Sequence, residues 1–203
     1  MLAARVSGFA RRVPNWVLYI MCLLPIPVGF WQGLSGQLGP EPIRALEHLY
    51  GWYALAFMVA VLLVTPLRRL LGVNLIAWRR TLGLVAFIYV AAHLLVWLVL
   101  DLQDIARIWA DILKRPYITV GMAAFLLMLP LALTSTNWAI RRMGPVRWKR
   151  LHYLTYGVAV LGAVHFVMLR KGVQIEPLLW LLAVLGLLAL RLPWGARATA
   201  LPR

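Results

Sequence analysis

The chain has 203 residues, of which 63% are hydrophobic and only 13% are charged, and its mean hydropathy is +0.82. A water-soluble domain of this length needs far more polar surface, so the composition excludes an ordinary soluble protein and predicts an integral membrane protein. The net charge is +15, but the chain has no polar domain with a basic patch that could bind nucleic acid. The single cysteine, Cys22, excludes a disulfide framework, a CxxC redox pair and a cysteine-ligated iron–sulfur cluster within one chain.

Six apolar segments are long enough to cross a bilayer, at roughly 20 residues each. The first contains Pro25 and Pro27, which predict a kink, and it lacks the small-residue cleavage site of a signal peptide. We therefore expect an all-α integral membrane protein, a six-transmembrane-helix bundle that forms a single domain over residues 1–203. The expected spans are 14–34, 48–67, 81–100, 116–136, 150–169 and 175–192.

Basic residues concentrate on one side of this layout. If the N-terminus is cytoplasmic, most of the 21 lysine and arginine residues fall on cytoplasmic segments, whereas all six acidic residues fall on outer segments. Because the Lys/Arg bias sets membrane topology, both termini are expected in the cytoplasm. The arginine clusters would then fix the orientation of the chain in the membrane and contact anionic lipid. A more specific alternative is that some of these arginines bind a phosphate-bearing cofactor. The acidic residues are Glu41, Glu47, Asp101, Asp104, Asp111 and Glu176.

The stretch DLQDIARIWADILKRP, residues 101–116, lies between the third and fourth spans. Its apolar residues recur at helical spacing with charges between them, which predicts an amphipathic helix near 101–115 on the outer membrane surface. Such a helix serves either as a docking platform for another protein or as a simple connector between spans.

Imidazole is the main polar chemistry of the predicted spans, because none has an internal Asp, Glu or Lys. That composition argues against a proton pump or an ion channel built on acidic residues. At about 1.5 Å per residue, His93 lies about 18 Å and His165 about 22 Å from the cytoplasmic start of its span. The two therefore reach similar levels in the outer half of the bilayer. His152 lies close to the cytoplasmic surface, and His48 opens the second span at the outer surface.

Two neutral imidazoles at one depth on different helices suit a planar, apolar cofactor with a central metal. Haem b fits best, because its iron takes axial histidines and its ring lies among apolar side chains. Zinc is an alternative without visible third and fourth ligands at that depth, and His48 and His152 also suit simple interfacial hydrogen bonding. Small residues should line a haem site, although they also serve helix packing. Those near the two deep histidines are Ala86, Ala91, Ala92, Ala159, Gly162 and Ala163.

The order of the spans and the placement of the histidines resemble the ferric-reductase-like transmembrane domain family. More narrowly, they resemble its haem-binding membrane subunits of periplasmic methionine sulfoxide reductase systems. The resemblance covers nearly the whole chain, and its segments are specific only jointly, through their order. The matching stretches are EHLYGWYALAFMVAVLLVTPLRR (47–69), WRRTLGLVAFIYVAAH (78–93), RPYITVGMAAFLLMLPLALTS (115–135) and RWKRLHYLTYGVAVLGAVHF (147–166).

This resemblance implies a haem b electron-transfer subunit in the bacterial inner membrane, without a substrate-transforming site of its own. It implies electrons from the quinone pool and a periplasmic, molybdopterin-containing partner that reduces methionine sulfoxide and so repairs oxidised proteins. It also implies FMN as a further cofactor. By position, His93 and His165 match the family's haem ligands, His152 matches a further haem ligand, and His48 falls on a family position.

Two features depart from the wider family. There, a second histidine for an inner haem often stands thirteen residues before the position of His93, but Arg80 occupies that place here and leaves His152 without its expected partner. The chain also lacks a GxGxxG motif and ends eleven residues after the sixth span, so electrons are expected from quinol or a separate reductase rather than directly from a nicotinamide. A stand-alone ferric or quinone reductase, and a non-redox metal permease or scaffold, are the alternative functions.

Overall fold

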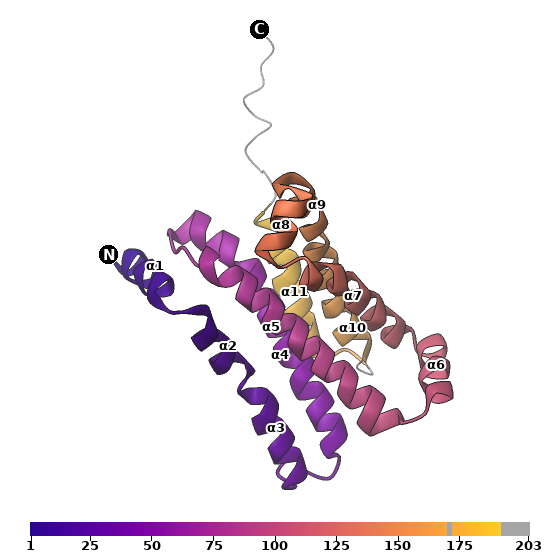
Figure 1. The fold of residues 1–203 in the computed structure, drawn as a ribbon. Coiled ribbons are helices and arrows are strands. Elements are labelled where there is room, and N and C mark those ends of the chain that lie inside the picture. Colours follow the sequence, from indigo (N-terminus) through magenta and orange to yellow (C-terminus); the bar gives the residue numbers. More distant parts are fainter. Residues whose placement is uncertain (170–171, 192–203) are drawn as a thin grey trace.

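The computed structural model describes residues 1–169 and 172–191, without the side chains at positions 105 and 107. All secondary structure within these residues is helical, and the longest helices lie side by side as a bundle (Figure 1). The helices are α1 (Leu2–Arg12), α2 (Asn15–Leu23), α3 (Pro25–Leu34), α4 (Pro42–Leu71), α5 (Ile76–Leu95), the π-helix η1 (Val96–Leu102), α6 (Ile105–Lys114), α7 (Pro116–Leu133), α8 (Asn137–Met143), α9 (Pro145–His152), α10 (Leu154–Leu169) and α11 (Ile175–Ala189).

Five of the six expected spans are present as helices long and apolar enough to cross a membrane, which makes the chain a multi-pass membrane protein. The expected sixth span corresponds to α11, an apolar helix of only 15 residues. At about 1.5 Å per residue, α11 is about 22 Å long, shorter than the roughly 30 Å hydrocarbon core of a bilayer. The five spans are Asn15–Leu34, Pro42–Leu71, Ile76–Leu102, Pro116–Leu133 and Pro145–Leu169.

The first span is broken at Leu24, where α2 gives way to α3, as its two prolines predict. Backbone carbonyls near such a break need donors, because the hydrocarbon core offers no water. Two tyrosines supply them: the Tyr50 hydroxyl donates to the Ile26 carbonyl at 2.6 Å, and the Tyr89 hydroxyl donates to the Cys22 carbonyl at 2.8 Å. The broken span is thereby tied to α4 and α5.

Two antiparallel helix pairs, α4 with α5 and α7 with α10, form the centre of the bundle (Figure 1). A shared apolar core joins the pairs, with Leu62 and Val184 fully buried in it. Ala86, Ala159 and Ala163, which were expected to line a cofactor site, are fully buried in the same core. These three alanines therefore serve the close packing of helices, the alternative role that the sequence left open.

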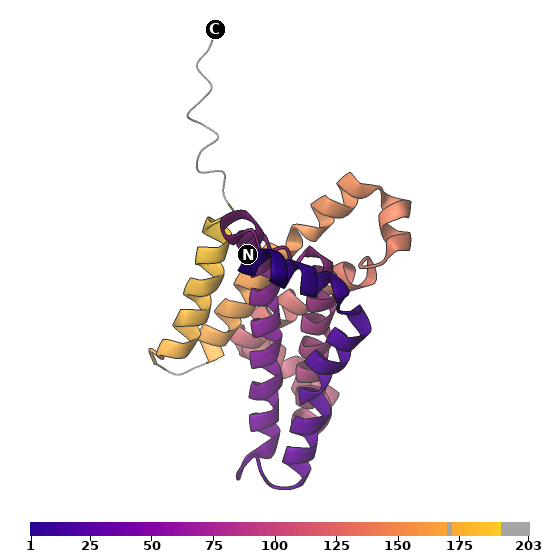
Figure 2. The same cartoon turned by 90° about the vertical axis from the view of Figure 1, so that its left-hand side faces the viewer.

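The two ends of the bundle differ in charge. All six acidic residues lie on η1, on or immediately before α6, or at the starts of α4 and α11. We call this end of the bundle the α6 end (Figure 1). The opposite end, which we call the arginine-rich end, includes α8 and α9, which project from the bundle as the orange hairpin of Figure 2. Helix α1 and the last turn of α11 also lie at the arginine-rich end. Its basic residues include Arg68, Arg69, Arg79, Arg80, Arg141, Arg142, Arg147, Lys149 and Arg150.

Arg191 anchors the end of α11 to α4. Helix α4 continues through Pro66, which has no N–H to donate to the Leu62 carbonyl four residues earlier. The Arg191 guanidinium supplies that donor, and it also donates to the Tyr156 hydroxyl at 3.1 Å. One guanidinium thus satisfies a carbonyl that the proline leaves open and fixes the end of α11 at the arginine-rich end.

The expected surface helix is α6, which starts after Asp104 rather than at 101, because residues 101–102 continue the third span as the end of η1. The Asp104 carboxylate caps the first turn of α6. Trp109 and Leu113, two of the expected apolar residues, are 64% and 69% exposed. An exposed apolar face of this kind is what a helix lying on a membrane surface requires.

Candidate functional site

The structure brings His93 of α5 and His165 of α10 together in the part of the bundle toward the α6 end. Their ring centroids are 6.3 Å apart, and the ring planes make an angle of 79°. The sequence placed these two histidines at similar levels on different helices. In the fold they are direct neighbours, contributed by the two helix pairs at the centre of the bundle.

Both rings are oriented by backbone carbonyls of the facing helix. His93 Nδ1 lies 2.9 Å from the Glu47 carbonyl oxygen on α4, and His165 Nδ1 lies 2.7 Å from the Tyr117 carbonyl oxygen on α7. Because a carbonyl only accepts, Nδ1 is the protonated nitrogen of each neutral ring. A backbone acceptor on the second nitrogen is typical of metal-binding histidines. Nε2 is therefore the nitrogen left unprotonated for a metal.

The donor set fits the axial ligation of a haem. With a metal–nitrogen bond of about 2.0 Å and about 1.1 Å from Nε2 to the ring centre, two imidazoles on opposite sides of one metal have centroids about 6.2 Å apart. The observed separation of 6.3 Å agrees with this value. A porphyrin brings four nitrogens of its own, so two histidines complete its iron. Among the described residues, no three His, Cys, Asp or Glu side chains gather as a closed zinc site would require.

Two glycines lie against these rings: Gly51 on α4 and Gly121 on α7, each one helical turn beyond the carbonyl acceptor. A Cβ atom on Gly121 would come within 2.8 Å of His165 Nδ1, and one on Gly51 within 3.3 Å of His93 Nδ1. The small residues expected from the sequence lie on the helices that carry the histidines, whereas these glycines lie on the facing helices. The sequence showed these two residues only as glycines inside expected spans.

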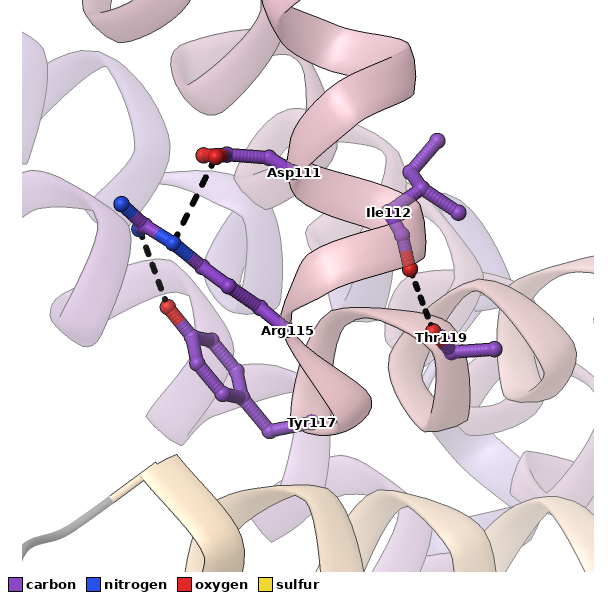
Figure 3. A network of polar contacts seen from close by, with 5 residues as sticks. All are labelled: Asp111, Ile112, Arg115, Tyr117 and Thr119. Atoms are coloured by element: carbon purple, nitrogen blue, oxygen red, sulfur yellow. Dashed lines mark hydrogen bonds and ion pairs between the residues drawn. The ribbon is translucent and has the colours of Figure 1, made fainter.

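Helix α6 braces the first turn of α7, where Tyr117 lies (Figure 3). Arg115 pairs with Asp111 at 3.4 Å and donates to the Tyr117 hydroxyl at 3.3 Å, and the Thr119 hydroxyl donates to the Ile112 carbonyl. The hydrogen bond to Tyr117, with a smaller contribution from the Asp111 carboxylate, raises the pKa of the Arg115 guanidinium, which stays charged. The surface helix is thus connected to the residue whose carbonyl orients one histidine of the pair.

His152 has different surroundings, where α9 meets α10. Its ring stacks on Trp148, with centroids 3.8 Å apart, and its Nε2 lies 3.1 Å from Thr134 Oγ1. The Thr134 hydroxyl donates its own proton to the Pro130 carbonyl at 2.6 Å, so it accepts from His152. Nε2 is therefore the protonated nitrogen of His152. Because a metal binds an unprotonated nitrogen, Nε2 cannot bind a metal while this hydrogen bond is in place.

Arginines at the start of α5 border His152. Arg80, which occupies the position of the wider family's inner histidine, donates to Asn137 Oδ1 at 2.8 Å. Arg191 donates to the Tyr156 hydroxyl, and Arg79 lies near the same tyrosine. Arginine side chains thus surround His152 with fixed positive charge.

The sequence predicted that His48 opens the second span, but the structure places it inside helix α4. Helix α4 begins at Pro42, because proline is favourable at the first helical position, and His48 lies in its second turn. The ring is half-buried. His48 therefore lies within α4, one residue after Glu47, whose carbonyl faces His93.

Comparisons with known proteins agree with this picture of the chain. The family model for the ferric reductase like transmembrane component matches residues 50–163. The chain is 50% identical over 178 residues to the protein-methionine-sulfoxide reductase heme-binding subunit MsrQ of Agrobacterium fabrum, covering 87% of this chain and 82% of that relative. Proteins of the same name from Rhizobium meliloti (46% over 192 residues; 91% and 88% covered) and Brucella ovis (45% over 199 residues; 94% and 90% covered) are also similar. No solved structure matches.

Proposed function

This chain belongs to the family of ferric-reductase-like transmembrane components and is similar throughout to MsrQ subunits, and we propose that it is the haem b electron-transfer subunit of a protein-methionine-sulfoxide reductase system. The observation that carries the proposal is the His93–His165 pair, with both Nδ1 atoms on backbone carbonyls and ring centroids 6.3 Å apart. A haem bound by this pair supplies a one-electron Fe(III)/Fe(II) couple.

The two histidines would hold and orient the haem and tune its couple. A hydrogen bond from Nδ1 to a carbonyl makes the opposite nitrogen more basic, so a haem iron held by these nitrogens would be stabilised in its ferric state. The acceptors are main-chain atoms of two packed helices, so the rings keep their orientation when the charge at the site changes. A site of this kind carries electrons and transforms no substrate of its own.

We place the arginine-rich end in the cytoplasm and the α6 end in the periplasm, in the inner membrane of a bacterium and within one domain. The Lys/Arg asymmetry between the ends supports this orientation. The anchoring of α11 to α4 by Arg191 supports α11 as a short sixth crossing, with both termini cytoplasmic. The histidine pair then lies toward the periplasmic side, and residues 35–47 together with α6 form the docking surface for a partner.

The proposed partner is an MsrP-like, molybdopterin-containing catalytic subunit in the periplasm, and the proposed electron donor is quinol. The relatives' name, which includes protein-methionine-sulfoxide reductase, supports this pairing. Reduction of one methionine sulfoxide to methionine and water takes two electrons and two protons. This chain must therefore deliver two successive electrons for each oxidised methionine repaired.

The remaining proposed cofactors belong mainly to the arginine-rich end. Arg79, Arg80 and Arg191 provide the charge-assisted donors that the phosphate of FMN needs. A second haem at His152 requires that ring to leave Thr134, so that its Nε2 loses the proton it donates there. His48 remains a proposed cofactor contact beside the histidine pair.

A reoxidation experiment tests the proposed function. The purified protein should show a Soret band that shifts on reduction by dithionite, as expected of a b-type cytochrome. Under anaerobic conditions, a catalytic amount of the periplasmic subunit together with methionine sulfoxide should reoxidise the reduced protein completely. Methionine sulfoxide alone should not reoxidise it, and the subunit alone should accept no more than its own two electrons per molecule. A protein without a Soret band overturns the cytochrome assignment. Reoxidation by ferric citrate but not by the partner pair overturns the subunit role in favour of a stand-alone ferric reductase.

A further inference from the structure

We infer that Gly51 and Gly121 are positioning residues for the histidine pair: each leaves open the flank of a helix so that one imidazole can reach a backbone carbonyl. This inference rests on the proposed function for its haem readouts, and on the geometry of the chain for the rest. It assigns a role in the site to two residues that carry no reactive group.

The two halves of the site repeat one arrangement. On α4, the Glu47 carbonyl accepts from His93, and Gly51 follows four residues later. On α7, the Tyr117 carbonyl accepts from His165, and Gly121 follows four residues after the acceptor. The acceptor and its histidine are 46 residues apart in the first half and 48 in the second. The same local unit is thus built twice, once on each central helix pair.

Helix geometry explains why glycine stands four residues after the acceptor. A helical side chain leans toward the N-terminus and covers the preceding turn, so the residue at i+4 covers the carbonyl of residue i. Glycine leaves that carbonyl open from the side. The His165 ring lies directly in this opening, because a Cβ on Gly121 would lie 2.8 Å from its Nδ1 and 2.9 Å from its Cε1. A side chain at position 121 would therefore force the ring to move.

Other reasons for glycine do not apply at these two positions. Neither residue has a positive φ, so any L-residue could adopt the backbone conformation. Alanine is the better helix former by about 1 kcal/mol. Gly157 on α10 and Gly186 on α11 have no atom within 4 Å of a built Cβ, so these two helical glycines meet no neighbouring side chain and serve as a comparison.

The two half-sites differ in how much room they leave. A Cβ on Gly51 would lie 3.3 Å from His93 Nδ1 and 3.5 Å from its Cε1, a tight separation that a small shift of the ring relieves. The Gly121→Ala change should therefore displace its histidine more than the Gly51→Ala change. The controls are Gly157→Ala and Gly186→Ala, which gain the same helix propensity without meeting a ring.

The test compares these four variants in the full-length protein. Gly121→Ala should lower haem affinity about tenfold or more, since outer contacts of metal ligands typically carry that much. The haem that remains should have a more positive midpoint potential and an altered low-spin EPR signal, because its ligand has lost the carbonyl bond. Gly51→Ala should fold and shift the potential less, and both controls should match the wild type. Wild-type haem content, potential and EPR signal in Gly121→Ala would overturn the inference, as would equal losses in the controls.

A second readout separates this inference from the proposed function. In haem-free protein, ¹⁵N spectra of the histidines report which ring nitrogen carries the proton. The wild type should show His93 and His165 protonated at Nδ1, and Gly121→Ala should change the signal of His165 alone. If the wild type binds no haem, the proposed function fails while this comparison still decides the role of the glycines. An unchanged His165 signal in Gly121→Ala would contradict the inference, whether or not the protein binds haem.

Discussion

His93 and His165 toward the α6 end, and His152 at the arginine-rich end, are the same residue type in opposite chemical states. The paired rings donate from Nδ1 to backbone carbonyls, whereas His152 donates from Nε2 to the hydroxyl of Thr134. The pair lies against glycines, and His152 lies against the face of Trp148. The environment, rather than the residue type, decides which nitrogen each ring offers to a metal.

The hydrogen-bond acceptors of the three histidines also differ in whether a substitution can remove them. Thr134 is a side-chain acceptor, which one substitution removes. The acceptors of the paired rings are main-chain carbonyls, which no substitution of Glu47 or Tyr117 removes. Orientation of the pair is therefore built into two helices, and orientation of His152 depends on a single hydroxyl. The comparison suggests a rigid electron-transfer site at one end and an adaptable region at the other.

The largest effect that tests this comparison is expected from the histidines themselves. His93→Ala or His165→Ala should abolish the low-spin signal of the paired-histidine haem, because each removes one axial ligand. His152→Ala should leave that signal intact and lower the haem content only by the share of a second haem. Haem per polypeptide and the EPR spectrum measure both effects. If His152→Ala removed the signal while His93→Ala kept it, the two regions would have been assigned the wrong way round.

A smaller effect is expected when the hydroxyl beside His152 is removed. Thr134→Val deletes the acceptor for His152 and should cost about 1 kcal/mol of stability, the typical net value of one hydrogen bond. Ser135→Ala is the matched control, because that hydroxyl donates to the Leu131 carbonyl at the end of α7 and not to His152. Thermal unfolding measures the difference, and the paired-histidine signal should not change in either variant. A loss of that signal in Thr134→Val would show that the two regions are coupled.

The spans and the depth of the histidines could be predicted from the sequence because both depend on regular quantities. Hydropathy over about 20 residues locates the helices, and the rise of about 1.5 Å per residue puts His93 and His165 at similar levels. The kink at Pro25 follows equally from the missing backbone donor. These predictions needed only local chemistry, and the structure agrees with them for five of the six spans, for the break in the first span and for the matching level of the two histidines.

The glycines and the state of His152 could not be predicted in the same way. Gly51 and Gly121 matter because of rings that lie 42 and 44 residues further along the chain, and which helix faces which is a property of the fold. The acceptors are backbone carbonyls, which every residue possesses, so no residue type marks them. The proton on His152 follows from Thr134 and Pro130, whose proximity depends on the packing of α7 against α9.

The central claim is that His93 and His165 jointly ligate one haem iron, and EPR spectroscopy of the oxidised, purified protein tests it most directly. Two imidazoles with planes at 79° should give a low-spin ferric signal of the strongly anisotropic kind that near-perpendicular axial ligands produce. That signal should be absent from His165→Ala. A high-spin ferric signal in the wild type, or an unchanged low-spin signal in His165→Ala, would contradict the account.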